Sequence, residues 1–293
     1  MHNAPPRFVI CIGAQKAGTT WLSEQLRHHP DFSLPPRKEI RYFDAIYTHD
    51  FETVRSQRLR EVRSRLNRII VDKVELTRAR ARDMRWHANY AIVTREQYND
   101  QWYWSLFASV DHQKVSGDFS PDYSLLPEAG IRHMKACAPH AKLFFVLRNP
   151  VDRIWSGAVY ALRHEIAAGR SPSPERVRAA VSAKIQWDFS NYRRTIETYE
   201  DVFGPQCINF LFYDTLLNEP LQFLERFCEM TEVSFDAKWF PKIENRVNEG
   251  PGLQRDPEIV REIAAASRDQ VDWLAQRFGG IAEAWRKDLE SIA

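Results

Sequence analysis

The sequence predicts an α/β fold, with a central, mostly parallel sheet between two layers of helices. Residues 8–12 and 143–147 are continuous apolar runs, too short for helices and typical of strands buried on both faces. A turn and a helical pattern follow each run, and such alternation produces parallel sheets. The 293 residues include 44% hydrophobic ones, enough for a sizeable core, and show neither an internal repeat nor a long linker. We therefore expect a single domain over residues 1–293.

Turn and helix signals define the expected elements along the chain. A helix follows Gly18, and a short strand follows the His-His-Pro sequence after it. Pro150 suits a first helical turn because it lacks an N–H group, and Gly169 with its Ser-Pro repeats ends that helix. After the first strand, the expected elements are helix 19–29, strand 31–34, helix 127–137, strand 142–147, helix 150–168, helix 192–203, strand 207–213, helix 220–230 and helix 257–278.

A glycine-containing loop joins the first expected strand to the first helix. Gly13 and Gly18 have the spacing of the phosphate-binding GxxxxGK[ST] loop, but Thr19 stands where its lysine belongs. The lysine of this loop, Lys16, lies between the glycines. Backbone N–H groups at a helix N-terminus favour a phosphate or sulfate. The loop therefore suits a short 5′ chain better than a triphosphate, within a P-loop-like three-layer sandwich.

A second segment, KLFFVLRNPVDRIWS, repeats the strand–turn–helix pattern. Arg148 leaves the strand at its carboxyl end, the edge at which open α/β sheets bind ligands. Ser156, about two helical turns later, is placed to add a hydroxyl to the same anion. The alternative is an arginine that is simply solvated on a loop.

Together the two segments resemble those of the sulfotransferases that use 3′-phosphoadenosine 5′-phosphosulfate (PAPS). QKAGTTW resembles the 5′-phosphosulfate loop of that family, and RNPVDRIWS resembles its 3′-phosphate motif. The resemblance implies PAPS as co-substrate, 3′-phosphoadenosine 5′-phosphate (PAP) as product, and no metal. The residues that it implies for cofactor binding are Gln15, Lys16, Ala17, Gly18, Thr19, Thr20, Trp21, Arg148, Ser156, Tyr213 and Arg246.

A third segment indicates the subtype. PRKEIRYFD resembles a motif of the carbohydrate sulfotransferases of the heparan sulfate N- and O-sulfating type, and the general base of that motif corresponds to Glu39. The segment GDFSPDY resembles a later motif of the same branch, but Asp118 replaces a glutamate and Phe119 replaces a lysine of the active site. The cysteine-bounded loop of the branch is missing, and residues 245–250 take its place, as in shorter, bacterial-type soluble members.

An arginine-rich insertion, at about residues 45–98, separates this motif from the match to the W-Y-x-x-x-F helix of the family at residues 102–107. Its apolar residues have helical spacing and predict an apolar stripe: Leu59, Val62, Leu66, Ile69 and Ile70. Its role stays open between a solvated face paired to Glu61, Asp72 and Glu75, a lid over the acceptor site, and a dimer contact. The arginines are Arg55, Arg58, Arg60, Arg63, Arg65, Arg68, Arg78, Arg80, Arg82 and Arg85.

Composition restricts the partners and the compartment. A net charge of +2 gives no reason to expect nucleic acid or a membrane surface. The N-terminal residues lack an apolar signal core, and no apolar run is long enough to span a membrane. The four cysteines are widely spaced, and the nine histidines have no metal-site spacing, so we expect reduced thiols and no metal. We expect a cytoplasmic protein, with a homodimer left open.

The reaction that these residues predict is in-line transfer of a sulfuryl group to a hydroxyl or amine. Glu39 acts as the general base, and Lys16 stabilises the charge that develops on the leaving group. The acceptor is a small molecule, a lipid or a carbohydrate. Two alternatives are a P-loop kinase or NTPase, with Asp72 or Asp214 as metal ligand, and a nucleotide-binding scaffold without chemistry. The absent GK[ST] lysine speaks against the first, and the presence of Lys16 and Glu39 against the second.

Overall fold

The structure of the chain, a computed structural model, describes residues 7–48, 50–71, 78–244 and 252–292. In these ranges four parallel strands form one sheet in the order β2-β1-β3-β4. This confirms the predicted α/β class with a parallel central sheet. The strands are β1 (Phe8–Gly13), β2 (Ser116–Phe119), β3 (Lys142–Leu147) and β4 (Ile208–Phe212).

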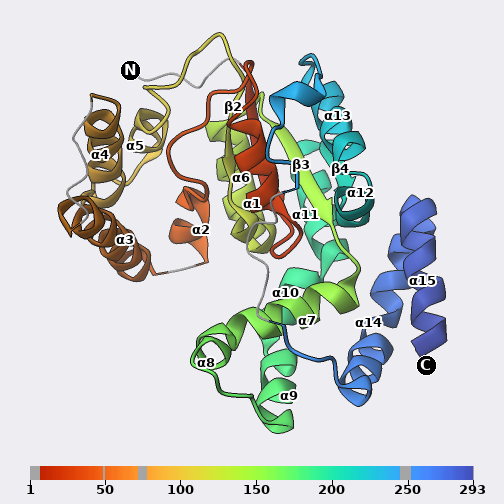
Figure 1. The fold of residues 1–293 in the computed structure, drawn as a ribbon. Coiled ribbons are helices and arrows are strands. Elements are labelled where there is room, and N and C mark those ends of the chain that lie inside the picture. The colour runs from red at the N-terminus through yellow and green to blue at the C-terminus, as the bar shows by residue number, and fades with distance from the viewer. Residues whose placement is uncertain (1–6, 49, 72–77, 245–251, 293) are drawn as a thin grey trace.

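The sheet lies between two helical layers, because its central strands present apolar side chains to both faces (Figure 1). The Phe144 ring of β3 packs against Phe227 of α13 (Pro220–Thr231), with ring centroids 4.5 Å apart. The next residue, Phe145, points to the opposite face and packs edge-on against Tyr192 of α11 (Tyr192–Phe203). The other described helices and 3-10 turns are α1 (Thr19–Leu26), α2 (Tyr42–Tyr47), α3 (Phe51–Val71), α4 (Arg78–Ala91), α5 (Asp100–Ser105), η1 (Pro121–Leu125), α6 (Glu128–Cys137), α7 (Pro150–Ala161), α8 (Arg163–Ala167), α9 (Pro174–Ser182), α10 (Lys184–Ser190), α12 (Tyr213–Asn218), η2 (Ala237–Trp239), α14 (Pro257–Phe278) and α15 (Gly280–Ile292).

Three sequence-based assignments were wrong. The expected strand 31–34 is reduced to one bridge between Phe32 and Val115. The strand beside β1 is instead Ser116–Phe119, which was missed because Gly and Asp are uncommon in strands. The helix expected over 150–168 ends at Ala161, and α8 follows it as a separate helix. The predicted helices 192–203 and 257–278 are confirmed.

The arginine-rich insertion forms the helices α3 and α4, which lie side by side away from the sheet (left in Figure 1). The buried side chains at the start of α3 are Phe51, Val54 and Arg58, whereas Leu59 is exposed. The predicted stripe is therefore wrong at Leu59, and the side chains of Leu66, Ile69 and Ile70 lie outside the described part of the chain. A charged residue thus occupies a position on the buried face of α3.

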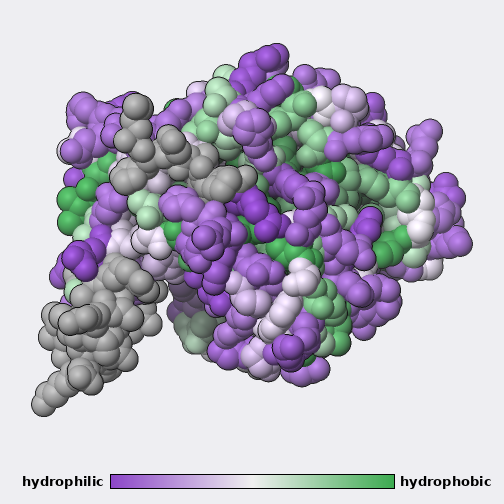
Figure 2. Space-filling view, turned by 90° about the horizontal axis from the view of Figure 1, so that it is seen from above, coloured by the Kyte–Doolittle hydropathy of each residue, from purple (hydrophilic) through white to green (hydrophobic). Residues whose placement is uncertain are grey.

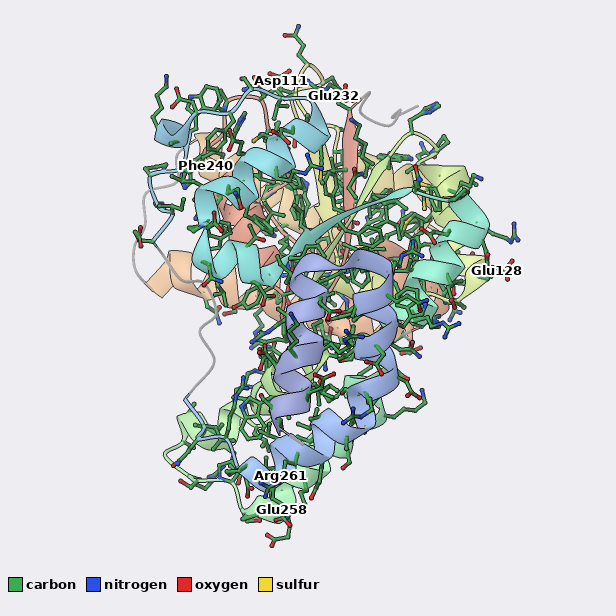
Figure 3. All side chains as sticks on the ribbon, turned by 90° about the vertical axis from the view of Figure 1, so that its right-hand side faces the viewer. Asp111, Glu128, Glu232, Phe240, Glu258 and Arg261 are labelled. Atoms are coloured by element: carbon green, nitrogen blue, oxygen red, sulfur yellow. The ribbon has the colours of Figure 1, made fainter. Side chains whose placement is uncertain are left out.

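The helices α14 and α15 form an antiparallel pair that packs against the rest of the protein through α7 (Figure 3). Trp285 of α15 is buried and donates its indole N–H to Asp214 of α12, at 3.0 Å. Glu258 at the start of α14 pairs with Arg178 of α9, at 2.6 Å. The pair therefore supports α12 and α7, two helices that contribute to the cavity described below.

Hydrophilic side chains cover most of the face shown in Figure 2, with hydrophobic ones in small patches between them. Within the described ranges, no helix has both the length and the apolar character needed to cross a membrane. The four cysteines are free thiols, as expected. Burial raises the pKa of the Cys11 and Cys228 thiols to about 12.

Asp118 of β2 is a buried carboxylate that fixes the segment before α2. It accepts hydrogen bonds from the hydroxyls of Ser120 at 2.6 Å, Tyr123 at 2.7 Å and Tyr103 at 3.3 Å. It also accepts one from the backbone N–H of Ile40, at 3.4 Å. Burial raises the pKa of this carboxyl, although the hydrogen bonds act in the opposite direction. Since it is enclosed by its own donors, Asp118 is a structural residue.

We expect Asp118→Ala to destabilise the protein by about 3 kcal/mol, because the hydroxyls and the N–H group that it binds would be left buried without an acceptor. Tyr103→Phe is the matched control and should cost only about 1 kcal/mol, since it removes a single hydrogen bond. Urea denaturation followed by circular dichroism measures both. An Asp118→Ala protein as stable as Tyr103→Phe would contradict this role.

Candidate active site

A cavity of about 540 Å³ lies where the carboxyl ends of β1 and β3 meet α1, α7 and α12. This is the edge at which open parallel sheets bind their ligands, and the volume lies in the range of small-molecule sites. The lining residues are Gln15, Lys16, Gly18, Thr19, Thr20, Trp21, Lys38, Glu39, Asp122, Arg148, Ser156, Tyr160, Tyr213, Leu216, Leu217, Pro220, Ile243 and Glu244.

The loop between β1 and α1 forms one wall of the cavity. The N–H group of Ala14 donates to the carbonyl of Val146 at 2.9 Å, which joins the loop to β3. Gly18 precedes α1 with φ of 81°, a left-handed conformation that favours glycine. A Cβ atom on Gly18 would also lie 2.6 Å from Cδ1 of Leu216. Glycine is therefore favoured here by the backbone turn, and a larger residue would also displace the Leu216 side chain of α12.

Arg148 connects the loop to the end of β3. Its Nη1 donates to the carbonyl oxygen of Lys16 at 2.6 Å, and its guanidinium lies over the Tyr213 ring at 4.5 Å. The Nε atom is buried and has no hydrogen-bond partner among the described residues. The carbonyl of Arg148 accepts a hydrogen bond from the Tyr192 hydroxyl at 3.0 Å, so the backbone is fixed as well. Arg148 is thus held in place while part of its donor capacity is unused.

Lys16 makes this part of the cavity strongly cationic. Its Nζ lies 4.5 Å from the centre of the Tyr160 ring. Burial lowers the pKa of Lys16, and the nearby charges of Arg148, Arg153, Arg163 and Lys38 lower it further. Among the described residues, no carboxylate forms an ion pair with Lys16 or Arg148. An anion bound here would therefore relieve repulsion between cations.

A second part of the cavity carries paired charges. Glu39 has a half-exposed side chain, and its Oε1 accepts from Lys38 Nζ at 2.5 Å. Asp122 pairs with Arg41 at 2.9 Å. The two parts differ in their charges. In the described part of the chain, Lys16 and Arg148 have no ion pair with a carboxylate, whereas Glu39 and Asp122 are each paired with a cation.

Most of the residues expected at the site line the cavity. The exceptions are Ala17, which is fully buried beside it, and Arg246, which lies outside the described residues. Sequence reasoning missed Lys38, Tyr160 and Leu216, although Lys38 adjoins Glu39 and was a visible signal. Asp214, considered as a metal ligand, accepts from Trp285 and does not line the cavity. No metal-binding cluster of His, Cys, Asp or Glu occurs among the described residues, and a metal-free site stays a prediction.

Comparisons with known proteins agree on one family. A family model described as "Sulfotransferase family" matches residues 6–237. The "Membrane-associated sulfotransferase kil1" of Dictyostelium discoideum is 27% identical over 148 residues. The matched region is half of this chain and covers 21% of the length of that protein.

Solved structures of sulfotransferases share the fold. A sulfotransferase from Alicyclobacillus acidocaldarius superposes with a TM-score of 0.61 at 22% identity, covering 97% of this chain and 99% of the other. The sulfotransferase domain of the Synechococcus PCC 7002 olefin synthase gives a TM-score of 0.50 at 17% identity, covering 89% and 88%. The first likeness extends over nearly the whole of both chains and confirms the expected P-loop-like fold.

The low pKa of Lys16 predicts that anion binding depends on pH. A bound sulfate favours the charged ammonium and raises the Lys16 pKa from its lowered value in the free protein. Between the free and bound pKa values, binding takes up a proton, so sulfate affinity falls as the pH rises through that interval. Sulfate titrations by calorimetry from about pH 7 to about pH 10 measure this. Lys16→Met is the control, because its affinity should be weak and independent of pH. Wild-type affinity that stays constant over the whole range would disprove the prediction.

Proposed function

Since this chain belongs to the sulfotransferase family, we propose that it transfers a sulfuryl group from PAPS to a hydroxyl or amine acceptor. The observation that carries the proposal is the pair Lys16 and Arg148, two cations that follow adjacent parallel strands and have no ion pair with a carboxylate among the described residues. PAPS carries two separate anionic groups, a 5′-phosphosulfate and a 3′-phosphate. A site with one cation on each of two neighbouring segments matches that arrangement better than a single triphosphate-binding loop does.

The residues present fit this co-substrate. Lys16, Gly18, Thr19 and Thr20 would hold the 5′ end, through the lysine, the hydroxyls and the N–H groups at the start of α1. The guanidinium of Arg148 and the hydroxyl of Ser156, both residues of the cavity lining, would bind the 3′-phosphate. The remaining expected residues would contribute as follows: Trp21 and Tyr213 as aromatic walls, and Gln15, Ala17 and Arg246 as further parts of the binding segments.

The two parts of the cavity have different roles in the proposed reaction. In the part with paired charges, Glu39 would remove the acceptor proton, since its carboxylate borders the cavity and Lys38 orients it. In the cationic part, Lys16 would stabilise negative charge on the leaving phosphate oxygen. Such transfer depends mainly on positioning and electrostatics, as in phosphoryl transfer. The less charged sulfuryl group does not require Mg²⁺ in this scheme.

A kinase or NTPase function is the alternative, because the loop resembles a phosphate-binding loop. Against it stand Thr19 in the position of the loop lysine and Asp214 bound to Trp285. Thermal-shift measurements distinguish the cases. Stabilisation by PAP without metal supports the sulfotransferase, stabilisation by ATP with Mg²⁺ supports the kinase, and stabilisation by neither supports a scaffold.

The proposal extends to the branch, the acceptor and the location. Glu39 in RKEIRYFD relates the chain most closely to the carbohydrate branch and to its shorter, bacterial-type soluble members, and the acceptor is a small molecule, lipid or carbohydrate. Four free thiols are typical of a reducing compartment such as the cytoplasm. The proposed partners include neither nucleic acid nor a membrane that the chain enters stably, and a homodimer is compatible with the proposal. A screen of sulfate transfer from labelled PAPS to these acceptor classes tests the assignment directly.

We expect Arg148→Ala to weaken PAP binding by roughly 2–4 kcal/mol, because a charge-assisted contact to the 3′-phosphate is lost. Adenosine 5′-phosphosulfate lacks that phosphate and is the matched ligand. Its affinity should fall by less than about 1 kcal/mol, the value of the hydrogen bond from Arg148 to the Lys16 carbonyl. Calorimetry measures both ligands, and equal losses would mean that Arg148 only supports the loop.

We expect Glu39→Gln to lower kcat by roughly 10²–10⁴-fold, because an amide cannot accept the acceptor proton. PAP affinity should stay unchanged, since the nucleotide contacts are assigned to other residues. Steady-state kinetics and PAP calorimetry measure the two effects. Asp122→Asn is the companion variant, because Asp122 is the next carboxylate of the cavity. If the turnover of Glu39→Gln stays within about threefold of wild type, Glu39 is not the base, and Asp122 becomes the candidate.

A further inference from the structure

Arg58 of α3 is an arginine without the usual reason for burial. Its relative exposure is 1%, and it shares the buried face of α3 with Phe51 and Val54. Buried arginines are normally paired with carboxylates, because removing the charge from water is costly. In the described part of the chain, Arg58 has no ion pair with a carboxylate. Its burial therefore has to be explained by the groups that it does contact.

Those groups belong to the segment that carries Glu39. Arg58 Nη2 donates to the carbonyl of Ile40 at 2.9 Å and to the carbonyl of Arg41 at 3.2 Å. The same nitrogen lies 2.7 Å from the hydroxyl of Tyr98, and that hydroxyl is 3.1 Å from the Arg41 carbonyl. The guanidinium carbon lies 4.7 Å from the centre of the Tyr90 ring. Further aromatic contacts, to Tyr98 and Trp102, complete an aromatic enclosure around the charge.

The backbone at these carbonyls has an uncommon conformation. Glu39 has φ of 64° and Arg41 has φ of 56°, both in the left-handed region that non-glycine residues seldom adopt. Such conformations are unfavourable for residues with a Cβ atom and persist only where the surroundings enforce them. On the other side of the segment, the N–H groups of Ile40, Arg41 and Tyr42 bind Asp118, Ser120 and Tyr123. Arg58 binds the carbonyls, and the two sets of contacts together fix the turn.

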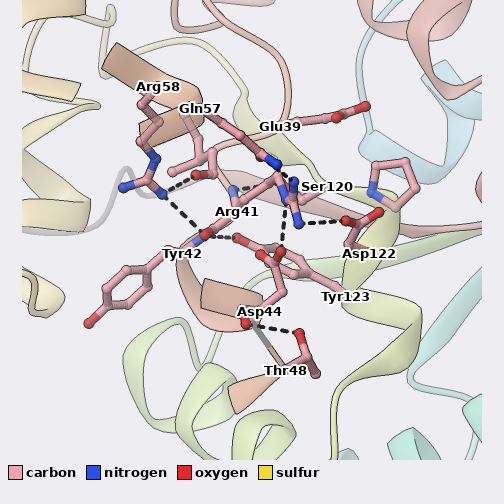
Figure 4. A network of polar contacts seen from close by, with 12 residues as sticks. Glu39, Arg41, Tyr42, Asp44, Thr48, Gln57, Arg58, Ser120, Asp122 and Tyr123 are labelled. Carbon is pink, nitrogen blue, oxygen red and sulfur yellow. Dashed lines mark hydrogen bonds and ion pairs between the residues drawn. The ribbon is translucent and has the colours of Figure 1, made fainter. Parts of the chain in front are cut away.

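The turn determines where the Glu39 side chain points. Figure 4 shows the Glu39 carboxylate directed away from the network of Arg58, Arg41 and Asp122. Glu39 itself lines the cavity. If the left-handed turn relaxed, the carboxylate of Glu39 would move relative to Lys16 even though neither side chain had changed.

We propose that Arg58 is a positioning residue for Glu39, and that the α3–α4 insertion serves to hold the segment 38–42 in its left-handed turn. This inference rests on the proposed function in one respect, namely that Glu39 is the base. It assigns the insertion a role in catalysis other than a charged surface, a lid or a dimer contact.

A guanidinium is suited to this task and an ammonium is not. One nitrogen, Nη2, binds both carbonyls, while the planar group lies against the rings of Tyr90, Tyr98 and Trp102. A lysine at position 58 would keep the positive charge but offer a strongly hydrated point charge without that planar contact. Arg58→Lys is therefore the informative variant, because it preserves charge and approximate length and removes the geometry.

The experiment compares Arg58→Lys with Arg60→Lys, a matched change on the exposed face of the same helix. We expect Arg58→Lys to lower kcat by at least about tenfold, because small displacements of a reacting group have large kinetic effects. The KM for PAPS and the affinity for PAP should stay within about twofold, since Lys16 and Arg148 lie on other segments. Hydrogen exchange of the amides in residues 37–44 should be faster than in wild type. Arg60→Lys should match the wild type in every measurement.

The outcomes separate this inference from the proposed function. A folded Arg58→Lys protein with wild-type kcat overturns the inference. Equal losses in kcat and PAP affinity also overturn it, because they indicate a general structural role. If Arg58→Lys does not fold, Tyr98→Phe carries the test, since it removes only the hydroxyl that joins Arg58 to Arg41, and unchanged kcat in that variant overturns the inference. If the wild type neither binds PAP nor transfers sulfate, the proposed function fails. In that case hydrogen exchange still tests Arg58, and unchanged exchange at residues 37–44 in the variants would overturn its positioning role.

Discussion

The cavity depends on the contact between two distant segments, which is made by hydrogen bonds from Ala14 N–H to the carbonyl of Val146 and from Arg148 Nη1 to the carbonyl of Lys16. The two bonds hold the loop after β1 against the end of β3, and the second brings two cationic residues together. Burial, and then repulsion from Arg148 and the neighbouring cations, lowers the Lys16 pKa and costs stability in the free protein. That cost is recovered when an anion binds, so the loop is organised for a ligand before any ligand is present.

The other wall of the cavity follows a different electrostatic rule. Lys38 pairs with Glu39 and Arg41 with Asp122, so the carboxylates are already matched. A matched wall attracts neither an anion nor a cation strongly and leaves recognition to shape and to individual hydrogen bonds. This difference in charge between the two walls orients a ligand that has an anionic end and a neutral end, because only the wall with Lys16 and Arg148 attracts the anionic end.

The parts of the site that the sequence predicted are those encoded by short continuous motifs. The loop around Lys16 and the strand end at Arg148 each combine an apolar run with a turn signal, and local patterns of that kind can be interpreted without a structure. Strand β2 was missed because Gly117 and Asp118 have a low preference for strands, and only its pairing with β1 identifies it. Arg58 was counted among ten arginines of an apparently solvated stretch. Its distinction comes from tertiary contacts with Ile40, Arg41 and Tyr98, which no local pattern contains.

The strand order has a consequence for folding during synthesis. β1 is the first strand of the chain, yet it lies between β2 and β3, whose paired residues follow it by more than a hundred positions. At synthesis rates of about 5–20 residues per second, both edges of β1 stay unpaired for several seconds or longer, until β2 and β3 have been synthesised. Unpaired apolar edges favour association with other chains, and such long-range pairing also slows folding. The nascent chain therefore has a period in which chaperone binding to residues 8–13 would protect it.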